Sequence, residues 1–272
     1  MSSTAFRSTS ASPAAIAAAV ILILIVGVNL QYLLLHLPAY PALYDSFPFW
    51  VPEGGKSALQ ILLCLGTLAA LRRINLPAIL RELGFGEPPL PAILFGFAAT
   101  LPLLLGLAAS GTLVREMDWA KEAYTAGFGN IAEEVLFAGF AFGQLHRRAR
   151  WPFWAAAGVA GAVFGYGHLD QGQDLASMAG LFVLTGGGLI AFAWLYRSWG
   201  YNLWVPLAMH GFMDLWWDLF ALGDTALGGA FPFVLQISTL AAAVAITLRM
   251  RPADRRGSQR AAVEEGAAAR QA

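Results

Sequence analysis

The sequence predicts an all-α fold, a polytopic helical membrane protein with about eight transmembrane helices. Of its 272 residues, 58% are hydrophobic and 12% are charged, whereas a soluble domain carries roughly 25% charged residues. The apolar residues also form long uninterrupted blocks, and about 20 of them cross a hydrocarbon core of ~30 Å. The formal net charge is zero, so there is no electrostatic basis for binding nucleic acid.

Each predicted helix is an apolar block bounded by charged residues, prolines or glycines. The first block follows Arg7 and is longer than the apolar core of a signal peptide, about 7–15 residues, so we expect it to be retained. The stretch from Thr112 to Gly127 is rich in charges and predicts a polar connection with a short surface helix. The blocks lie at residues 14–36, 57–71, 90–110, 129–145, 152–168, 176–196, 203–221 and 230–249.

The distribution of basic residues predicts the orientation, because lysine and arginine are retained on the cytoplasmic side. With the N-terminus inside, all of them except Lys56, Arg115 and Lys121 fall in cytoplasmic segments. We therefore expect both termini in the cytoplasm. Residues 1–250 are predicted to form a single membrane domain, and the polar residues 251–272 a disordered cytoplasmic tail.

Few ionisable residues lie inside the predicted helices. They are Glu133 and Glu134 in the fourth block, His168 at the end of the fifth, and His210 and Asp214 in the seventh. Each costs a few kcal/mol at membrane depth unless it is paired or hydrated, so such residues indicate function. At a rise of about 1.5 Å per residue, helices of alternating direction bring all of them to one layer in the outer half of the membrane.

The spacing of these residues indicates how they face a common site. Residues four apart share a helix face, as Phe164 and His168 do. Glu133 and Glu134 diverge by about 100°, so one should face a cavity while the other supports a neighbour.

A carboxylate in a poorly solvated pocket can act as general base toward a water that attacks a peptide carbonyl. His210 could donate a hydrogen bond to the resulting oxyanion. No cofactor is needed for this chemistry. The same atoms leave zinc open as an alternative, because two histidines and a glutamate, here Glu133, His168 and His210, are a known catalytic ligand set.

Three motifs resemble those of the CPBP (Abi) family, which contains the CAAX prenyl endopeptidases and their bacterial homologues. The family patterns Glu-Glu-x-x-x-Arg, Phe-x-x-x-His and His-x-x-x-Asn or Asp match Glu133 to Ala138, Phe164 to His168, and His210 to Asp214, within core motifs at 129–221. The sequence departs from the pattern at Ala138, where the family has arginine. Asp214 stands where the prenyl endopeptidase has asparagine.

The resemblance implies an intramembrane endopeptidase, of glutamic or metal-dependent type. It implies that Glu133 activates water with help from His168, that Glu134 supports the site, and that His210 and Asp214 stabilise the oxyanion. The expected partners are the lipid bilayer and a protein or peptide substrate in the membrane.

The predicted orientation adds that the substrate is a membrane-anchored or exported protein cleaved near the outer face, as expected of a bacterial inner-membrane protein. Two other functions remain open: a non-catalytic binding, immunity or scaffold protein, and a proton-coupled transporter, since buried carboxylates and histidines also form proton relays.

Overall fold

The computed structural model describes residues 11–222 and 227–268, and most of them are helical. The predicted all-α fold is confirmed, and each apolar block is largely helical, although the seventh block ends in the short strand at Phe220–Ala221. The α-helices are α1 (Pro13–Val28), α2 (Leu30–Leu35), α3 (Pro41–Ser46), α4 (Trp50–Arg72), α5 (Leu76–Leu83), α6 (Pro89–Ser110), α7 (Trp119–Glu122), α8 (Asn130–Glu134), α9 (Gly143–Arg147), α10 (Phe153–Tyr166), α11 (Leu175–Ser198), α12 (Trp204–Asp218) and α13 (Ala230–Ala268).

Short irregular elements complete the described chain. Two π-helical segments, η1 (Ala123–Gly129) and η2 (Val135–Phe142), flank α8, and a 3-10 turn, η3 (Leu169–Gln171), precedes α11. The strands β1 (Thr112–Leu113) and β2 (Phe220–Ala221) pair antiparallel, with Thr112 opposite Ala221.

Four helices of the described chain are long and apolar enough to cross a membrane. They are α4, α6, α11 and the part of α13 at Ala230–Met250, while α1 is apolar but shorter. The protein is therefore a multi-pass membrane protein, and the number of eight spans stays a prediction.

Local sequence signals explain where several helices begin. Ser12 and Asn75 cap α1 and α5 through their side-chain oxygens, and a proline occupies the first turn of each helix. Asp174 forms a capping box with Ser177 at the start of α11. These side chains accept hydrogen bonds from backbone N–H groups that have no partner within the helix.

One continuous helical path, from α7 to α9, carries the glutamate pair. It begins at Trp119 with Asp118 as its cap, where the sequence predicted a polar connection with a short surface helix up to Gly127 and a membrane helix from residue 129. The path is π-helical on both sides of α8. Such π segments are uncommon and frequently occur at functional sites.

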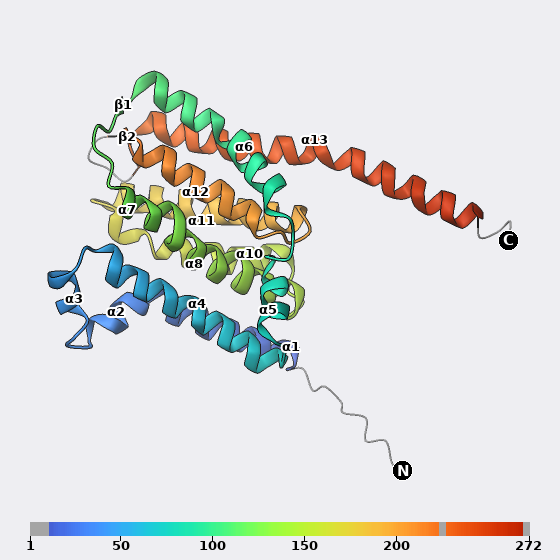
Figure 1. Ribbon diagram of the computed structural model, residues 1–272, viewed down its shortest axis with the longest axis horizontal. Helices are drawn as coiled ribbons and strands as arrows, with labels where there is room; N and C mark the ends of the chain where they lie inside the picture. Colours follow the sequence, from blue (N-terminus) through green and yellow to red (C-terminus); the bar gives the residue numbers. More distant parts are fainter. Residues whose placement is uncertain (1–10, 223–226, 269–272) are drawn as a thin grey trace, which may run out of the picture.

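Different loops and short elements lie at the two ends of the helical bundle (Figure 1). The start of α1 and helix α5 lie at one end, whereas α2, α3, α7 and the β1–β2 pair lie at the other. At the first end Glu82 binds Arg148, with the arginine Nε 2.8 Å from the carboxylate, and also contacts Arg72. Loops that the charge distribution assigns to the cytoplasmic side thus meet at one end. Arg7, which belongs to the same prediction, lies outside the described residues.

Helices α10 and α11 pack with their backbones in close contact. A Cβ atom added to Gly161 would lie 2.6 Å from the carbonyl oxygen of Gly186, and one added to Gly165 would lie 2.8 Å from that of Phe182. Small residues allow such an approach between membrane helices. This packing holds the end of α10, which carries His168, against α11.

The C-terminal helix continues past the predicted end of the membrane domain. Its backbone stays helical to Ala268, where the sequence predicted a disordered tail from residue 251. Alanine, glutamate and arginine are strong helix formers, which explains a helix in this composition. The domain boundary at residue 250 and the disorder of the tail stay predictions, and residues 269–272 lie outside the described chain.

Candidate active site

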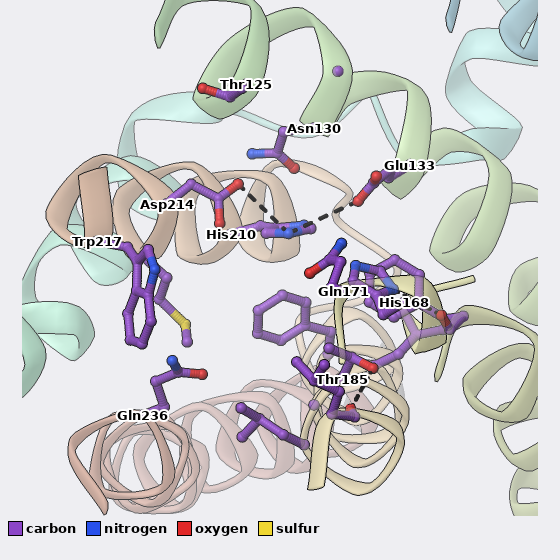
Figure 2. A pocket seen from close by; sticks show the side chains of 18 of the residues that line it. Thr125, Asn130, Glu133, His168, Gln171, Thr185, His210, Asp214, Trp217 and Gln236 are labelled. Atoms are coloured by element: carbon purple, nitrogen blue, oxygen red, sulfur yellow. Dashed lines mark hydrogen bonds and ion pairs between the residues drawn. The ribbon is translucent and has the colours of Figure 1, made fainter. Parts of the chain in front are cut away.

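A pocket of about 490 Å³ lies between the three motif-bearing helices and helices α11 and α13. Glu133, His168, His210 and Asp214 all line it, so four of the five residues predicted from the sequence share one cavity. Figure 2 shows His210 between Glu133 and Asp214, with His168 on the side of Glu133. The wall formed by α11 and α13 is largely apolar and includes Leu181, Leu184, Leu189, Phe192 and Leu240.

His210 is the centre of the polar cluster. Its Nδ1 lies 2.9 Å from an oxygen of Glu134, and its Nε2 lies 3.9 Å from Glu133 and 3.7 Å from Asp214. Three carboxylates therefore surround one imidazole ring. Phe192 packs against the ring at 5.8 Å between centroids, which limits the access of water from that side.

The two glutamates occupy different environments. The side chain of Glu133 is 41% exposed and faces the pocket, whereas that of Glu134 is 1% exposed and does not line it. Residues adjacent in a helix point about 100° apart, which explains this division. Glu133 can thus reach a molecule in the pocket, while Glu134 is separated from the pocket and contacts His210.

Ala138, at the position of the family arginine, is fully buried beside the glutamates. One oxygen of Glu134 bonds to His210, and the other has no hydrogen-bond partner among the described residues. An arginine one turn after Glu134 would lie on its face of the helix. In this chain, His210 pairs with that carboxylate.

His168 lies just after the end of α10, in the turn that leads to η3. Its Nδ1 is 2.8 Å from the carbonyl oxygen of Phe164 and therefore donates to it. A neutral ring with hydrogen on Nδ1 has Nε2 as an acceptor. Among the described residues, His168 and Glu133 form no hydrogen bond or ion pair, although both line the pocket.

Several pocket residues do not belong to the predicted set, and Asn130 is the most informative of them. It is 4% exposed and lines the pocket, three residues before Glu133 and four before Glu134. Helical spacing from the glutamates is the signal that could have identified it. The other polar lining residues are Lys121, Tyr124, Thr125, Gln171, Thr185, Trp217, Asp218 and Gln236.

Glu122, in α7 before the apolar part of its helix, adds a further buried carboxyl near the pocket. Burial and the neighbouring carboxylate of Asp218 raise the pKa of Glu122 to about 7. The negative charge of Asp214 acts in the same direction. Glu122 therefore changes charge near neutral pH.

A zinc ion was the alternative that the sequence left open, with Glu133, His168 and His210 as ligands. Among the residues that the structure describes, no group of three or more His, Cys, Asp or Glu side chains is arranged to hold a metal ion. Zinc at these residues stays a prediction, and no step below uses it.

Comparison with known proteins agrees with the motifs. Residues 117–216 match the family model described as type II CAAX prenyl endopeptidase Rce1-like. The searches of curated proteins and of solved structures give no match. The matched segment begins just before α7 and ends in α12, so it contains all five predicted site residues. Residues 117–216 thus form an Rce1-like domain, in agreement with the resemblance of the motifs to the CPBP family of CAAX proteases.

Proposed function

We propose that the protein is an intramembrane endopeptidase that hydrolyses a peptide bond of a membrane-anchored or exported protein, with Glu133 as the general base. The observation that carries this proposal is the arrangement around His210. One carboxylate, Glu133, is open to the pocket, and a second, Glu134, is buried behind the ring. A base and an oxyanion donor thus face one cavity from two different helices.

In the proposed reaction, Glu133 takes one proton from a water molecule as the water oxygen attacks the scissile carbonyl carbon. The new C–O bond forms while the carbonyl π electrons move to oxygen, which gives a tetrahedral oxyanion. When the C–N bond breaks, the proton on Glu133 passes to the leaving amine. General base catalysis of this kind contributes about 10²–10⁴-fold to rate.

His168 would assist the attacking water. Its Nδ1–H is engaged by the Phe164 carbonyl oxygen, so the neutral ring presents Nε2 as an acceptor that can share the proton that Glu133 takes from the water. The ring packs at 4.4 Å between centroids on Phe164. That contact and the backbone hydrogen bond hold the imidazole in one orientation.

His210 would stabilise the oxyanion through Nε2–H. Glu134 and His210 Nδ1 share one proton. If that proton is on Nδ1, a doubly protonated ring also carries hydrogen on Nε2, and if it is on the Glu134 carboxyl, the neutral ring carries its single hydrogen on Nε2. Asp214, on the same face one turn later, lies 3.7 Å from Nε2. Its carboxyl can donate to the oxyanion when it is protonated, as an asparagine amide would.

The apolar wall of the pocket suits a substrate that approaches from the membrane. The orientation inferred from the basic residues places the pocket in the outer half of a bacterial inner membrane, with both termini in the cytoplasm. A substrate would be cleaved close to the outer face. The apolar side chains of α11 and α13 would contact its membrane-embedded segment.

The test compares purified wild type with Glu133→Gln and His210→Ala on a library of quenched fluorogenic peptides. We expect Glu133→Gln to abolish cleavage and His210→Ala to lower kcat by about 10²–10³-fold, the effect of losing an oxyanion donor. His146→Ala is the matched control, because His146 binds the Trp151 carbonyl oxygen away from the pocket, and it should keep full activity.

Two outcomes would overturn the proposal. If neither substitution changes cleavage, the activity belongs to a contaminant. If the wild type cleaves no peptide, the non-catalytic or transporter alternatives are favoured. Metal analysis and a chelator titration of the same preparation test the glutamate mechanism separately. If activity is lost with chelator and restored by zinc, a metal-dependent mechanism replaces the glutamate mechanism.

A further inference from the structure

Asn130 is a buried polar residue inside the candidate site that no motif includes. It begins α8, is 4% exposed, and lies on the pocket surface with Glu133 and His210. Residues three and four apart share a helix face, so Asn130 lies on the same side of its helix as the glutamates. In Figure 2 its amide lies above the His210 ring, with the oxygen turned toward Glu133.

Two backbone carbonyl groups define the orientation of the Asn130 amide. Its Nδ2 donates to the carbonyl oxygen of Leu207 at 3.2 Å and to that of Ala126 at 3.4 Å. Because carbonyl oxygens only accept, the nitrogen must face them and Oδ1 must face the other way. The orientation of the amide therefore follows from its hydrogen bonds.

Gly211 makes this arrangement possible. A Cβ atom at Gly211 would lie 2.8 Å from the Ala126 carbonyl oxygen and 3.0 Å from Asn130 Nδ2. The absence of a side chain next to His210 thus lets α12 approach α8 closely enough for the hydrogen bond to Leu207. The position of the amide relative to His210 is determined by direct backbone packing.

The opposite atom, Oδ1, is buried and has no hydrogen-bond partner among the described residues. Buried acceptors in proteins are nearly always paired with protein or water. The carboxylates of Glu133 and Asp214, when ionised, are acceptors and cannot pair with it. A water molecule that enters the pocket is a donor from which Oδ1 can accept.

We infer that Asn130 positions the nucleophilic water by accepting, through Oδ1, the hydrogen that Glu133 does not remove. This inference rests on the proposed function. Water has two hydrogens, and holding both of them directs an oxygen lone pair toward the scissile carbon. During attack one proton moves to Glu133, and the other stays on the attacking oxygen, hydrogen-bonded to Asn130. The asparagine exchanges no proton and is a positioning residue.

A purely structural role is the competing explanation, since Asn130 also joins α8 to α12. Asn130→Leu removes both functions at similar volume, whereas Asn130→Asp, when protonated, can donate to Leu207 and still present an oxygen to the water. Asn202→Leu is the matched control. Asn202 is 6% exposed and its Oδ1 accepts from the Trp204 N–H outside the pocket.

The experiment measures kcat, KM and thermal unfolding of these variants and of Glu133→Gln on a peptide cleaved by wild type. For Asn130→Leu we expect kcat to fall about 100-fold with KM unchanged, the cost of misplacing a reacting group. For Asn130→Asp we expect the ratio of kcat to that of wild type to be highest at low pH and to fall as the aspartate ionises. Asn202→Leu should lower thermal stability and leave kcat unchanged.

A loss of activity in Glu133→Gln with wild-type kcat in Asn130→Leu would overturn this inference and leave the proposed function standing. If Asn130→Leu does not fold, the pH profile of Asn130→Asp decides, and a kcat ratio independent of pH would count against water positioning. If no peptide in the library is cleaved by wild type, the proposed function and this inference fail together.

Discussion

Replacing Glu134 with glutamine tests whether the buried carboxylate supports His210. The side chain is 1% exposed, and its Oε1 lies 2.9 Å from His210 Nδ1. Glutamine has nearly the same volume, so Glu134→Gln opens no cavity. Its amide oxygen can still accept from Nδ1–H, but it carries no negative charge and cannot hold the shared proton.

The size of the effect follows from the change in hydrogen-bond type. A hydrogen bond to a charged group contributes about 1.5–3 kcal/mol and a neutral one about 0.5–1.5 kcal/mol. The substitution therefore removes about 1–1.5 kcal/mol from the support of a doubly protonated His210. Since about 1.4 kcal/mol corresponds to a tenfold change in rate, we expect kcat to fall roughly tenfold while KM is unchanged.

The assay combines steady-state cleavage of a fluorogenic peptide with thermal unfolding of the purified protein. Glu82→Gln is the matched control, because Glu82 is also a buried carboxylate, 7% exposed, with Arg148 Nε at 2.8 Å. It lies at the arginine-rich end of the bundle, outside the pocket. We expect Glu82→Gln to lower stability at least as much as Glu134→Gln and to leave kcat of the folded protein unchanged.

Unchanged kcat in Glu134→Gln would refute the reasoning, because Glu134 would then be a structural group without influence on the oxyanion donor. A loss of kcat in Glu82→Gln of the same size would refute it as well. In that case, general destabilisation of the bundle would account for both effects.

Two further predictions concern stability and orientation. Because the pKa of Glu122 is raised to about 7 from its ordinary value of 4.5, the folded state prefers the protonated carboxyl. Its stabilisation is complete below the ordinary value and is lost as pH rises through about 7. The melting temperature should therefore fall between pH 6 and pH 8, and it should fall less in Glu122→Gln. Glu116→Gln, at an exposed position, is the control and should leave the dependence of melting temperature on pH unchanged. Equal dependence in Glu122→Gln and wild type would contradict the prediction. For orientation, the predicted topology places Leu175 on the outer side and Glu87 on the cytoplasmic side. A membrane-impermeant maleimide should therefore label Leu175→Cys in intact cells and Glu87→Cys only after lysis, and native Cys64 gives no background because it is fully buried. The reverse labelling pattern would invert the topology.

The helical membrane fold could be predicted from sequence because the signal is compositional. Continuous apolar blocks such as 90–110 and 176–196 exceed what a soluble helix needs, and the structure has helices at Pro89–Ser110 and Leu175–Ser198. The ends of the helices were predicted less accurately. The helix that carries the glutamates begins at Trp119, ten residues earlier than its apolar block, because Asp118 caps a polar turn that no hydropathy pattern reveals.

Residue types and spacing were sufficient to select four residues that line one pocket and a fifth, Glu134, that contacts His210. Ionisable groups within apolar blocks are costly, and this alone singles out Glu133, Glu134, His168, His210 and Asp214. The π-helical segments that flank the glutamates have no equally clear sequence signal. Asn130 escaped notice because a single asparagine at the start of an apolar block resembles an ordinary helix boundary.

What the sequence determined by itself is the class of the protein and the chemistry available to it, since both depend on composition and on short motifs within single helices. Only the tertiary structure decided which glutamate faces the pocket, which is paired with His210, and that the amide of Asn130 is oriented by carbonyl groups of two segments. These relations depend on helix rotation and on close approach at Gly211. Contacts between residues 76 or 77 positions apart, which bring Asn130 and Glu134 to helix α12, are set by packing and leave no local pattern in the chain.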